Sequence, residues 1–487
     1  MKKNLLFLGL LGLAFNSYAQ QTNLGPWVEV NTQNTNAFVP GFRITDVKTV
    51  SANVAWIVAR ENTTNSLSNY AFVTNNAAGD QFNFASTIPT VGTQTLTTGN
   101  ISPVGLPGTP AASTTAIAAT YPRTGAGGEI IRTTDGGQSW NAVTSAAQFN
   151  GNNNGFCDFV HMFNATTGIA FGDPTNNSFE ILRTTDGGVT WTRLPAASSP
   201  APLTGEAGLT RSFFALGNTI WAGTGSTDEF APVRVLRSTD QGLTWTASPV
   251  TALLGGITRL AFKDAQNGIA FNTKDDGNAT SEVNMIRTSD GGATWQPITP
   301  VNNATGSFYY YEIDAVNGRY YSSGQRFPSA RANADFGFST STDGINWTNI
   351  VSGGAEFFAF DLIPGTATGS AVGYAGLQTD AAGVGGIYKT ASAIVAASRD
   401  AALQSVLSVY PNPGTGVFSV DLGANLKAGA ELTVSDALGR RVKAQTLNAA
   451  TVGARKLTLD LTGEKTGIYT LQIRTEAGIA TQKVALN

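Results

Sequence analysis

Pairs of apolar runs, each pair separated by a short polar turn, recur along most of the chain. Four examples are DFVHMFNATTGIAFG (158–172), RSFFALGNTIWAG (211–223), RLAFKDAQNGIAF (259–271) and YYEIDAVNGRYYSSG (310–324). Runs of this length, bounded by glycine and asparagine, predict hairpins of two β-strands. A third apolar run and a fourth that often begins with Thr-Trp follow the hairpins, so each repeat contains four predicted strands.

A polar box joins the third and fourth predicted strands of five repeats. It reads RTTDGGQSW (132–140), RTTDGGVTW (183–191), RSTDQGLTW (237–245) and RTSDGGATW (287–295), with a shorter copy, STDGINW (341–347). Its aspartates and tryptophans are Asp135, Trp140, Asp186, Trp191, Asp240, Trp245, Asp290, Trp295, Asp343 and Trp347. The carboxylate can accept hydrogen bonds from turn amides, glycine supplies the left-handed conformation, and the indole packs into an apolar face. Because the box recurs five times, we assign it a structural role rather than a place in a single active site.

Four strands in a repeat of about 50 residues are the composition of one β-propeller blade. The pattern Thr133-x-Asp135-x-Gly137-x-Ser139-Trp140 resembles the Asp-box (BNR) repeats of sialidases, sortilin-type receptors and photosystem-assembly-factor-like propellers. Four copies match at all five positions, and the fifth lacks one residue. The resemblance implies a β-propeller, but it indicates little about function, because one fold supports many functions.

Two further repeats lack the box. The segments ITDVKTVSANVAWIVA (44–59) and EFFAFDLIPGTATGSAVGYAG (356–376) repeat the hairpin pattern. The second of them lacks a fourth strand, which PWVEV (26–30) can supply by pairing beside residues 386–390. Joining both ends of the repeat region in one sheet would remove exposed sheet edges. The sequence therefore predicts an all-β fold in which residues 21–392 form one seven-bladed β-propeller.

The pattern changes after a polar, alanine-rich linker (393–404). The segments LSVYPNPGTGVFSVDL (407–422), ELTVSDALGRRV (431–442) and KLTLDLTGEKTGIYTLQIRTEAGIATQKVALN (456–487) predict a small antiparallel β-sandwich over residues 405–487. The YPNP, GRRV, GIYTLQI and KVALN segments resemble the type A C-terminal sorting domain of Bacteroidetes type IX secretion. This resemblance implies that the type IX machinery is a partner, and that the tail is removed before surface attachment or release.

The N-terminus predicts export. Lys2 and Lys3 precede an apolar segment from Leu5 to Phe15 and a small-residue cleavage site, so residues 1–19 are a predicted signal peptide. The apolar segment is shorter than the roughly 20 residues that span a membrane, and no transmembrane segment is predicted. We expect a secreted, extracellular or outer-membrane surface-attached protein.

The amino-acid composition excludes several classes of function. With 13% charged residues and a net charge of -3, the chain is not a basic nucleic-acid binder. The single cysteine, Cys157, excludes an intramolecular disulfide and is predicted to be a buried thiol. The single histidine, His161, is predicted to be a packed strand residue, with a reactive role as the alternative. We expect no cofactor and no metal.

Ligand binding is predicted on one face of the ring. Because strands alternate in direction, the box turns share one face with the hairpin turns, and the loops between second and third strands share the opposite face. Long loops on a rigid scaffold are the usual place for binding. The predicted binding residues are Arg43, Arg123, Arg211, Arg259, Tyr309, Arg326, Asp228 and Glu229, with Asp173, Glu206, Asp275, Asp276, Tyr310 and Arg331 nearby. Arginines beside tyrosines suit a sugar or a carboxylate-bearing ligand.

Two functions are consistent with these features. The first is a non-catalytic binding or structural role at the cell surface, in which the loop face recognises a glycan or a protein. The second is an exported glycoside hydrolase of the sialidase type, because GFRIT (41–45) is similar to the Phe-Arg-Ile-Pro segment of that family. However, Thr45 replaces the proline, and the tyrosines at 309–311 precede Arg326 and Arg331, the reverse of the family order. We therefore expect the non-catalytic role.

Overall fold

The computed structural model describes residues 24–30, 42–61, 69–74, 82–83, 90–91, 94–105, 107–122, 126–274, 282–302, 306–326, 336–367, 369–377, 386–391, 393–395, 403, 406–423, 426, 429–436, 441–475 and 478–487. The chain divides into two compact units. The first comprises Met1–Gly365 and Ala371–Ile394, and the second comprises Thr366–Ser370 and Val395–Asn487.

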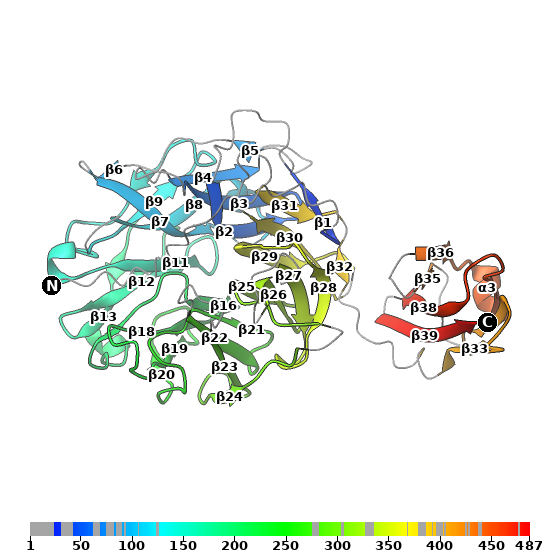
Figure 1. Ribbon diagram of the computed structural model, residues 1–487. Coiled ribbons are helices and arrows are strands. Elements are labelled where there is room, and N and C mark those ends of the chain that lie inside the picture. Colours follow the sequence, from blue (N-terminus) through cyan, green and yellow to red (C-terminus); the bar gives the residue numbers. More distant parts are fainter. Residues whose placement is uncertain are drawn as a thin grey trace. The chain divides into compact units, whose positions relative to one another are not determined.

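The first unit consists of antiparallel sheets that follow one another around a ring, from the blue to the yellow part of the chain (Figure 1). In its described residues there are seven sheets of four or five strands, here numbered in chain order. Sheet 1 contains β2 (Phe42–Ser51), β3 (Val54–Glu61), β4 (Asn69–Thr74) and β5 (Phe82–Asn83). Sheet 2 contains β6 (Thr90–Val91), β7 (Gln94–Pro103), β8 (Ala116–Pro122), β9 (Glu129–Thr133) and β10 (Asn141–Ala142), with the short helix α1 (Pro110–Thr114) between β7 and β8.

Sheets 3 and 4 form the next part of the ring. Sheet 3 contains β11 (Cys157–Met162), β12 (Gly168–Thr175), β13 (Ser178–Thr184) and β14 (Thr192–Arg193), and sheet 4 contains β16 (Phe213–Leu216), β17 (Thr219–Gly223), β19 (Val235–Ser238) and β20 (Thr246–Ala247). A separate ladder pairs β15 (Glu206–Ala207) with β18 (Gly225–Ser226). Two 3₁₀ turns, Gly151–Asn153 and Ala196–Ser198, lie in the connections.

Sheets 5 to 7 complete the ring. Sheet 5 contains β21 (Arg259–Phe262), β22 (Gly268–Lys274), β23 (Glu282–Thr288) and β24 (Gln296–Ile298). Sheet 6 contains β25 (Glu312–Val316), β26 (Arg319–Gln325), β27 (Phe336–Ser341) and β28 (Thr348–Ser352). Sheet 7 contains β29 (Ala359–Pro364), β30 (Ser370–Gly376), β31 (Ile387–Thr390), β32 (Ile394–Val395) and β1 (Trp27–Glu29).

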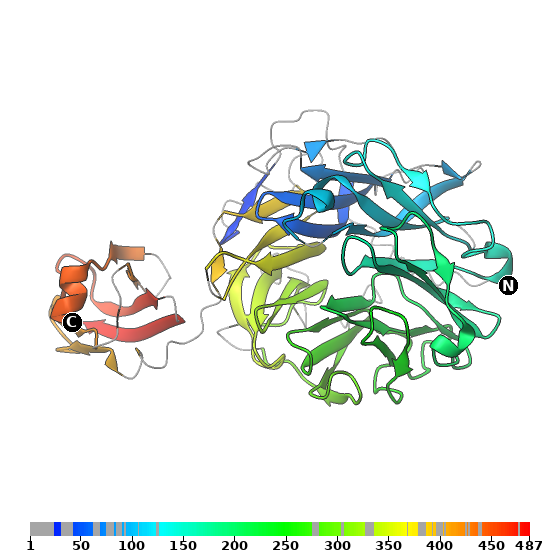
Figure 2. The same cartoon turned by 180° about the vertical axis from the view of Figure 1, so that it is seen from behind.

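The two ends of the ring meet in sheet 7. Strand β1 pairs antiparallel with β31, with Trp27 opposite Thr390 and Glu29 opposite Tyr388. The Trp27 ring lies edge-on to Phe338 and Phe357, with centroids 5.3 and 5.2 Å away. The inner strand β2 also contacts both β29 and β7, so sheets from opposite ends of the sequence lie side by side (Figure 2).

Side chains connect inner strands that belong to different sheets. Asp46 Oδ2 in β2 accepts a hydrogen bond from the Ile101 amide in β7 at 2.8 Å. The Asn100 side chain bonds both the amide and the carbonyl of Val160, each at 2.9 Å. Equivalent contacts join Ser102 Oγ to the Met162 amide, Asp314 Oδ2 to the Leu362 amide and Asp361 Oδ2 to the Thr49 amide, at 2.9, 2.7 and 2.7 Å. These bonds satisfy buried backbone groups that no ladder reaches.

Each box forms a closed network of hydrogen bonds. Asp186 accepts bonds from the amide and hydroxyl of Thr190 at 2.9 and 2.6 Å, and from the Thr184 hydroxyl at 2.7 Å. The Thr184 hydroxyl in turn accepts a bond from the Gly188 amide at 3.0 Å. Asp135, Asp240, Asp290 and Asp343 make corresponding contacts. The carboxylate therefore occupies the centre of the turn between the third and fourth strands.

Each box turn packs against the sheet that precedes it. The buried Trp191 of sheet 3 contacts a cluster that contains Ile117 of sheet 2, and Trp140, Trp245, Trp295 and Trp347 pack on their preceding sheets in the same way. Gly242 has a φ of +78°, and a Cβ at this position would lie 2.2 Å from Ile169 of sheet 3, so the turn requires glycine there. The first arginine of the box also bridges sheets, since Arg132 Nε donates to the Gly187 carbonyl at 2.9 Å.

The second unit is a sandwich of two antiparallel sheets. One contains β33 (Ser408–Tyr410), β34 (Val417–Asp421) and β37 (Lys456–Asp460). The other contains β36 (Arg441–Thr446), β35 (Glu431–Ser435), β38 (Gly467–Thr475) and β39 (Gly478–Leu486), and α3 (Ala449–Ala454) precedes β37. Phe418 and Leu459 of the first sheet pack with Val434 and Leu471 of the second in one core. The predicted fold class, an all-β propeller followed by a small antiparallel β-sandwich, is confirmed.

We predict that Asp186→Ala lowers the free energy of unfolding of the ring by about 1–3 kcal/mol, because the turn amides lose their acceptor. Chemical denaturation at pH 7 measures the change. Glu229→Ala, which removes an exposed carboxylate, is the matched control and should change stability by less than about 0.5 kcal/mol. Equal stability of Asp186→Ala and wild type would contradict the structural role of the box.

The contribution of Asp186 should also depend on pH. Partial burial opposes its ionisation, but the hydrogen bonds from Thr190 and Thr184 outweigh burial and lower its pKa to about 2, from 3.8. A carboxyl whose pKa is lower in the folded state stabilises the fold above its unfolded pKa, and this stabilisation is lost as pH falls. The difference between wild type and Asp186→Ala should therefore be constant above about pH 5 and shrink between pH 4 and pH 2.

Candidate functional site

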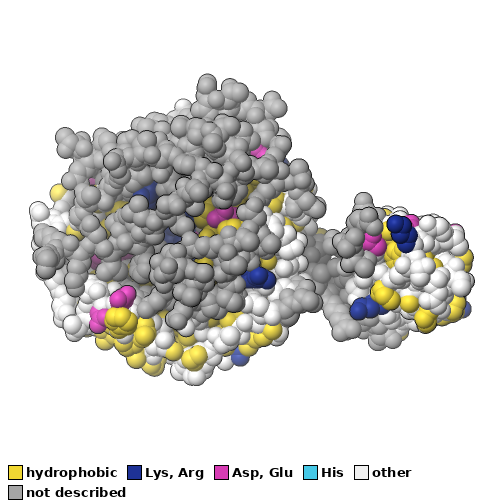
Figure 3. Space-filling view, viewed as in Figure 1, with side chains coloured by type: hydrophobic (Ala, Val, Ile, Leu, Met, Phe, Trp, Pro, Cys, Tyr) yellow, Lys and Arg dark blue, Asp and Glu magenta, His cyan; other side chains and the backbone are white. Residues whose placement is uncertain are grey.

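Strand direction defines two ends of the passage at the centre of the ring. The inner strands begin, and the second strands of each sheet finish, at one end, which we call the loop end. The hairpin turns and the box turns lie at the other end, which we call the box end. Titratable side chains gather at both ends, so each is a candidate site. On the ring face seen in Figure 3, basic and acidic side chains reach the surface near the middle.

Arg211 reaches across the passage between sheets. It precedes β16 in a left-handed backbone conformation (φ 62°), which is uncommon for a residue other than glycine. Its guanidinium donates to the Thr45 carbonyl of sheet 1 and lies 3.5 Å from Asp46 Oδ1. It also bonds Glu312 Oε2 of sheet 6 at 2.5 Å. The uncommon backbone conformation of Arg211 thus accompanies side-chain contacts that connect sheet 4 with sheets 1 and 6.

Glu312 is shared by two arginines. Arg259 Nε lies 3.1 Å from Glu312 Oε1, while Arg211 occupies the other oxygen. Burial lowers the pKa of the Arg259 guanidinium, and the charge of Glu312 opposes that effect. Asp46 balances the second arginine, and burial raises the pKa of Asp46 although Arg211 acts against it. Two positive and two negative groups therefore form a neutral network in the middle of the passage.

Arg43 lies at the loop end and packs on an aromatic ring. Its guanidinium carbon is 3.7 Å from the centre of the Phe358 ring, a cation–π contact. Burial lowers the pKa of Arg43, while the charges of Tyr311 and Glu356 raise it and those of Arg60 and Arg211 lower it. Arg43 and Arg60 of sheet 1 thus lie close enough to Tyr311, Glu356 and Arg211, which precede the inner strands of three other sheets, for their charges to act on Arg43.

Two carboxylates of sheet 3, at the loop end, lie close enough for their charges to interact. Asp158 and Asp173 each occupy a β-bulge, a local irregularity that redirects side chains and occurs often beside active sites. Asp173 Oδ1 accepts a bond from the Gly208 amide at 2.9 Å, and a Cβ on Gly208 would lie 1.9 Å from Asp158 Oδ2. Among the described residues, Asp158 Oδ2 has no hydrogen-bond partner.

The pKa values of this pair differ from the ordinary value. Burial, followed by the charge of Asp173, raises the pKa of Asp158 well above 3.8, and burial raises the pKa of Asp173 to about 6. The Asp158 charge also acts on Tyr121, whose pKa is raised mainly by burial. The pair therefore keeps a proton to a higher pH than an exposed carboxyl pair would, a condition that favours acid–base chemistry.

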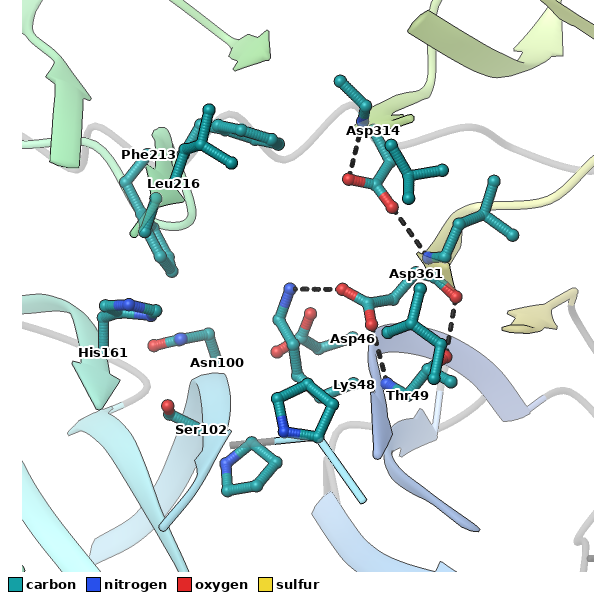
Figure 4. A pocket seen from close by; sticks show the side chains of 18 of the residues that line it. Asp46, Lys48, Thr49, Asn100, Ser102, His161, Phe213, Leu216, Asp314 and Asp361 are labelled. Atoms are coloured by element: carbon teal, nitrogen blue, oxygen red, sulfur yellow. Dashed lines mark hydrogen bonds and ion pairs between the residues drawn. The ribbon is translucent and has the colours of Figure 1, made fainter. Parts of the chain in front are cut away.

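A cavity of about 500 Å³ lies at the box end of the passage (Figure 4). Its lining extends from the Arg211–Glu312 network to the hairpin turns at Gly217 and Asn317. Lys48 Nζ lies 3.1 Å from Asp361 Oδ1 in its wall. The cavity thus lies opposite the loop end, where the sequence predicts ligand binding.

The predicted binding residues fall into three groups. Arg211 and Arg259 meet at Glu312, and Arg43 acts electrostatically on the same region. Tyr309 is buried and forms a β-bridge with the exposed Arg326, while Asp228 and Glu229 are exposed between β18 and β19. Arg123, Asp275, Asp276 and Arg331 lie outside the described residues, as do most of the predicted binding loops. The structure thus brings only part of the predicted set together.

Two residues near the predicted set have structural partners. Arg234 bonds both oxygens of Glu206, at 2.9 and 2.8 Å, so Glu206 is not aimed into the passage as a free carboxylate. The Tyr310 hydroxyl bonds Gln325 at 3.0 Å.

His161 lies in β11, as expected for a strand residue, but its side chain lines the cavity at the box end. Cys157 is buried, as predicted.

Sequence reasoning missed the acidic partners. Asp46, Asp158, Glu312, Asp314 and Asp361 all lie on, or next to the start of, apolar inner strands. A charged residue within an apolar run was the available signal, because burying it costs free energy unless it has a partner or a function. In the described part of the chain, no group of three or more His, Cys, Asp and Glu side chains could hold a metal ion.

Comparison with known proteins gives distant structural similarities. No curated protein matches the chain. The GH74 enzyme of Niastella koreensis is 14% identical, with a TM-score of 0.44 over 91% of this chain and 71% of that one. The GH74 xyloglucanase of Xanthomonas campestris is 15% identical (TM-score 0.26; 91% and 74%), and a Hadza microbial sialidase is 11% identical (TM-score 0.38; 73% and 66%).

The tail gives a specific match. Residues 408–487 match the family described as secretion system C-terminal sorting domain. No helix among the residues placed in the structure is long and apolar enough to cross a membrane. The match confirms the type IX sorting signal and export to the surface or the medium. Residues 408–487 are thus a C-terminal sorting domain of the type IX secretion system, and the β-propeller is its exported cargo.

Proposed function

We propose that this protein is a non-catalytic binding module of the cell surface or the medium, and that the loop end of its ring recognises a glycan. In this proposal the seven sheets are the blades of an Asp-box propeller over residues 21–392. Residues 393–404 are the linker, and residues 405–487 are the export signal.

The observation that carries the proposal is the convergence of half-buried polar groups around the buried Asp158 at the loop end. Arg43, Arg60, Tyr121, Asp158 and Arg211 come from four sheets, and electrostatic coupling links them. The box turns and the inter-sheet bonds already account for the closure of the ring. Burying additional charges is unfavourable for stability, so a role in recognition supplies the reason for their presence.

The chemistry of these groups suits an acidic sugar. Arginine presents a planar fork of donors that matches a carboxylate, and tyrosine offers both a ring face and a hydroxyl. Arg43 is already held on Phe358, so it can bind without ordering a flexible side chain. Exposed loop residues such as Asp228 and Glu229 would contact the outer part of a larger glycan.

We expect Arg43→Ala to weaken binding to uronic-acid or sialic-acid glycans by at least about tenfold, because a desolvated charge pair would be lost. A glycan array followed by calorimetry on the best ligand measures the change. Arg319→Ala makes the same substitution at the box end and should leave the affinity unchanged. Equal losses in both variants, or the absence of any glycan ligand, would remove the support for this proposal.

A glycoside hydrolase is the second candidate, and the Asp158–Asp173 pair is the observation that favours it. Hydrolysis of a glycosidic bond commonly uses two carboxyl groups, one protonated and one ionised. We expect no turnover of fluorogenic glycosides by the wild-type protein. Turnover that disappears in Asp158→Asn, and that rises through about pH 6 as Asp173 ionises, would instead establish the hydrolase.

We expect deletion of residues 405–487 to leave a folded ring in the periplasm, because the sorting signal lies in the tail and the ring core contains no tail residue. Cell fractionation and circular dichroism of the retained protein test this expectation. Deleting residues 478–487 alone should also stop export, since it removes β39 from the sandwich. Recovery of either truncated protein from the medium of intact cells would show that the tail is dispensable.

A further inference from the structure

The cavity at the box end, which we call the box-end cup, shares only Arg211 with the residues of the proposed glycan site. The network of Asp46, Arg211, Glu312 and Arg259 lies between the two. The volume of the box-end cup, about 500 Å³, is in the range of small-molecule sites. Figure 4 shows Asp314 and Asp361 on one side of it and Phe213, Leu216 and His161 on the other.

One wall of the box-end cup is acidic. Burial opposes the charge of Lys48, but Asp361, Asp46 and Asp314 together raise the pKa of its ammonium group. Lys48 forms an ion pair with Asp361 at 3.1 Å, and Asp46 is also attracted by Arg211. Lys48 pairs with Asp361 and Arg211 lies beside Asp46, so among the described residues only one of the three carboxylates has no cationic side chain in an ion pair with it.

Asp314 is that carboxylate. Its two oxygens accept hydrogen bonds from backbone amides, those of Ala315 and Leu362, both at 2.7 Å. Among the described residues it forms no ion pair, and its side chain is only half-buried. Burial, and then the charge of Asp361, raises the pKa of Asp314 to about 7. A cation placed in the cup would therefore gain an unpaired carboxylate as its partner.

The opposite wall is apolar and aromatic. Leu216 is 41% exposed, and the half-buried Phe213 and His161 rings lie 5.9 Å apart. Burial, and then the charge of Lys48, lowers the pKa of His161 to about 3, so its ring is neutral and can accept a hydrogen bond. A flat apolar surface opposite hydrogen-bonding groups suits a sugar ring, whose faces are apolar and whose edge is polar.

We propose that the box-end cup binds a small amino sugar, with its ammonium group on Asp314 and its ring against Phe213 and His161. A neutral sugar would leave the Asp314 carboxylate without a cation. An anionic sugar would be repelled by the three carboxylates of the wall. The amino sugar combines the two features that the opposite walls require.

The test uses His161 as a reporter, because it is the only histidine in the chain. The full-length protein, purified through a histidine-free tag and labelled at histidine, is titrated with glucosamine and its β-1,4-linked dimer at pH 7.5. We expect saturable shifts of the imidazole resonances, with glucose and N-acetylglucosamine at least about tenfold weaker, because neither carries an ammonium group. Without ligand, the imidazole should not titrate between pH 5 and pH 8.

Two variants localise the ammonium group. Asp314→Asn should lose the preference for glucosamine over glucose, whereas Asp264→Asn makes the same charge change on a carboxylate that does not line the cavity and should keep it. Glucosamine binding without a shift at His161, affinity equal to that of glucose, or unchanged preference in Asp314→Asn would each overturn the proposal. Should Asp314→Asn fail to fold, the ligand series on the wild-type protein decides the question by itself.

Discussion

The ring depends on contacts that hold adjacent sheets together, because no backbone ladder among the described residues connects one sheet to the next. Within each sheet the strands satisfy one another, but the inner strands of neighbouring sheets diverge. Two sets of contacts solve this problem. Near the passage, Asp46, Asn100, Asp314 and Asp361 bind backbone groups of the next sheet. At the periphery, each box turn places its tryptophan on the preceding sheet.

The first set of contacts gives the passage its unusual polarity. Carboxylates that bridge sheets must point along the inner strands, and this brings them close to one another around the axis. Their mutual repulsion and burial then require cations, which Lys48, Arg211 and Arg259 supply. The balance is incomplete at Asp314 and at the Asp158–Asp173 pair, where burial raises the pKa of each carboxyl group. The same polarity that closes the ring therefore creates the ionisable clusters at which we propose that ligands bind.

The C-terminal sandwich is stabilised in a different way from the ring. Its two sheets share one apolar core, with Phe418, Val434 and Leu471 fully buried, and it needs no bridging carboxylates. The ring has its own closure through β1 and β31. Because each unit has its own core, the sorting domain and the ring can each fold around their own apolar residues.

Sequence periodicity by itself determined the repeat, the hairpins, the position of each box and the nature of the tail. These features depend on local rules: alternation of apolar residues, turn residues at fixed offsets and glycine where the backbone is left-handed. The closing partner of residues 26–30 could also be inferred, because the last repeat lacked a strand. Arg43, Arg211 and Arg259 were identified as candidates because they precede or open inner strands.

Only the tertiary structure decided which charges meet. Glu312 is 101 residues from Arg211 and 53 from Arg259, and Asp361 is 313 from Lys48, so no local pattern could pair them. Asp158 and Asp173 come together because each lies at a bulge, and a bulge leaves no reliable mark in the sequence. Local periodicity specifies the strands, whereas the electrostatics of the passage arise from side chains that the closed ring brings together across sheets.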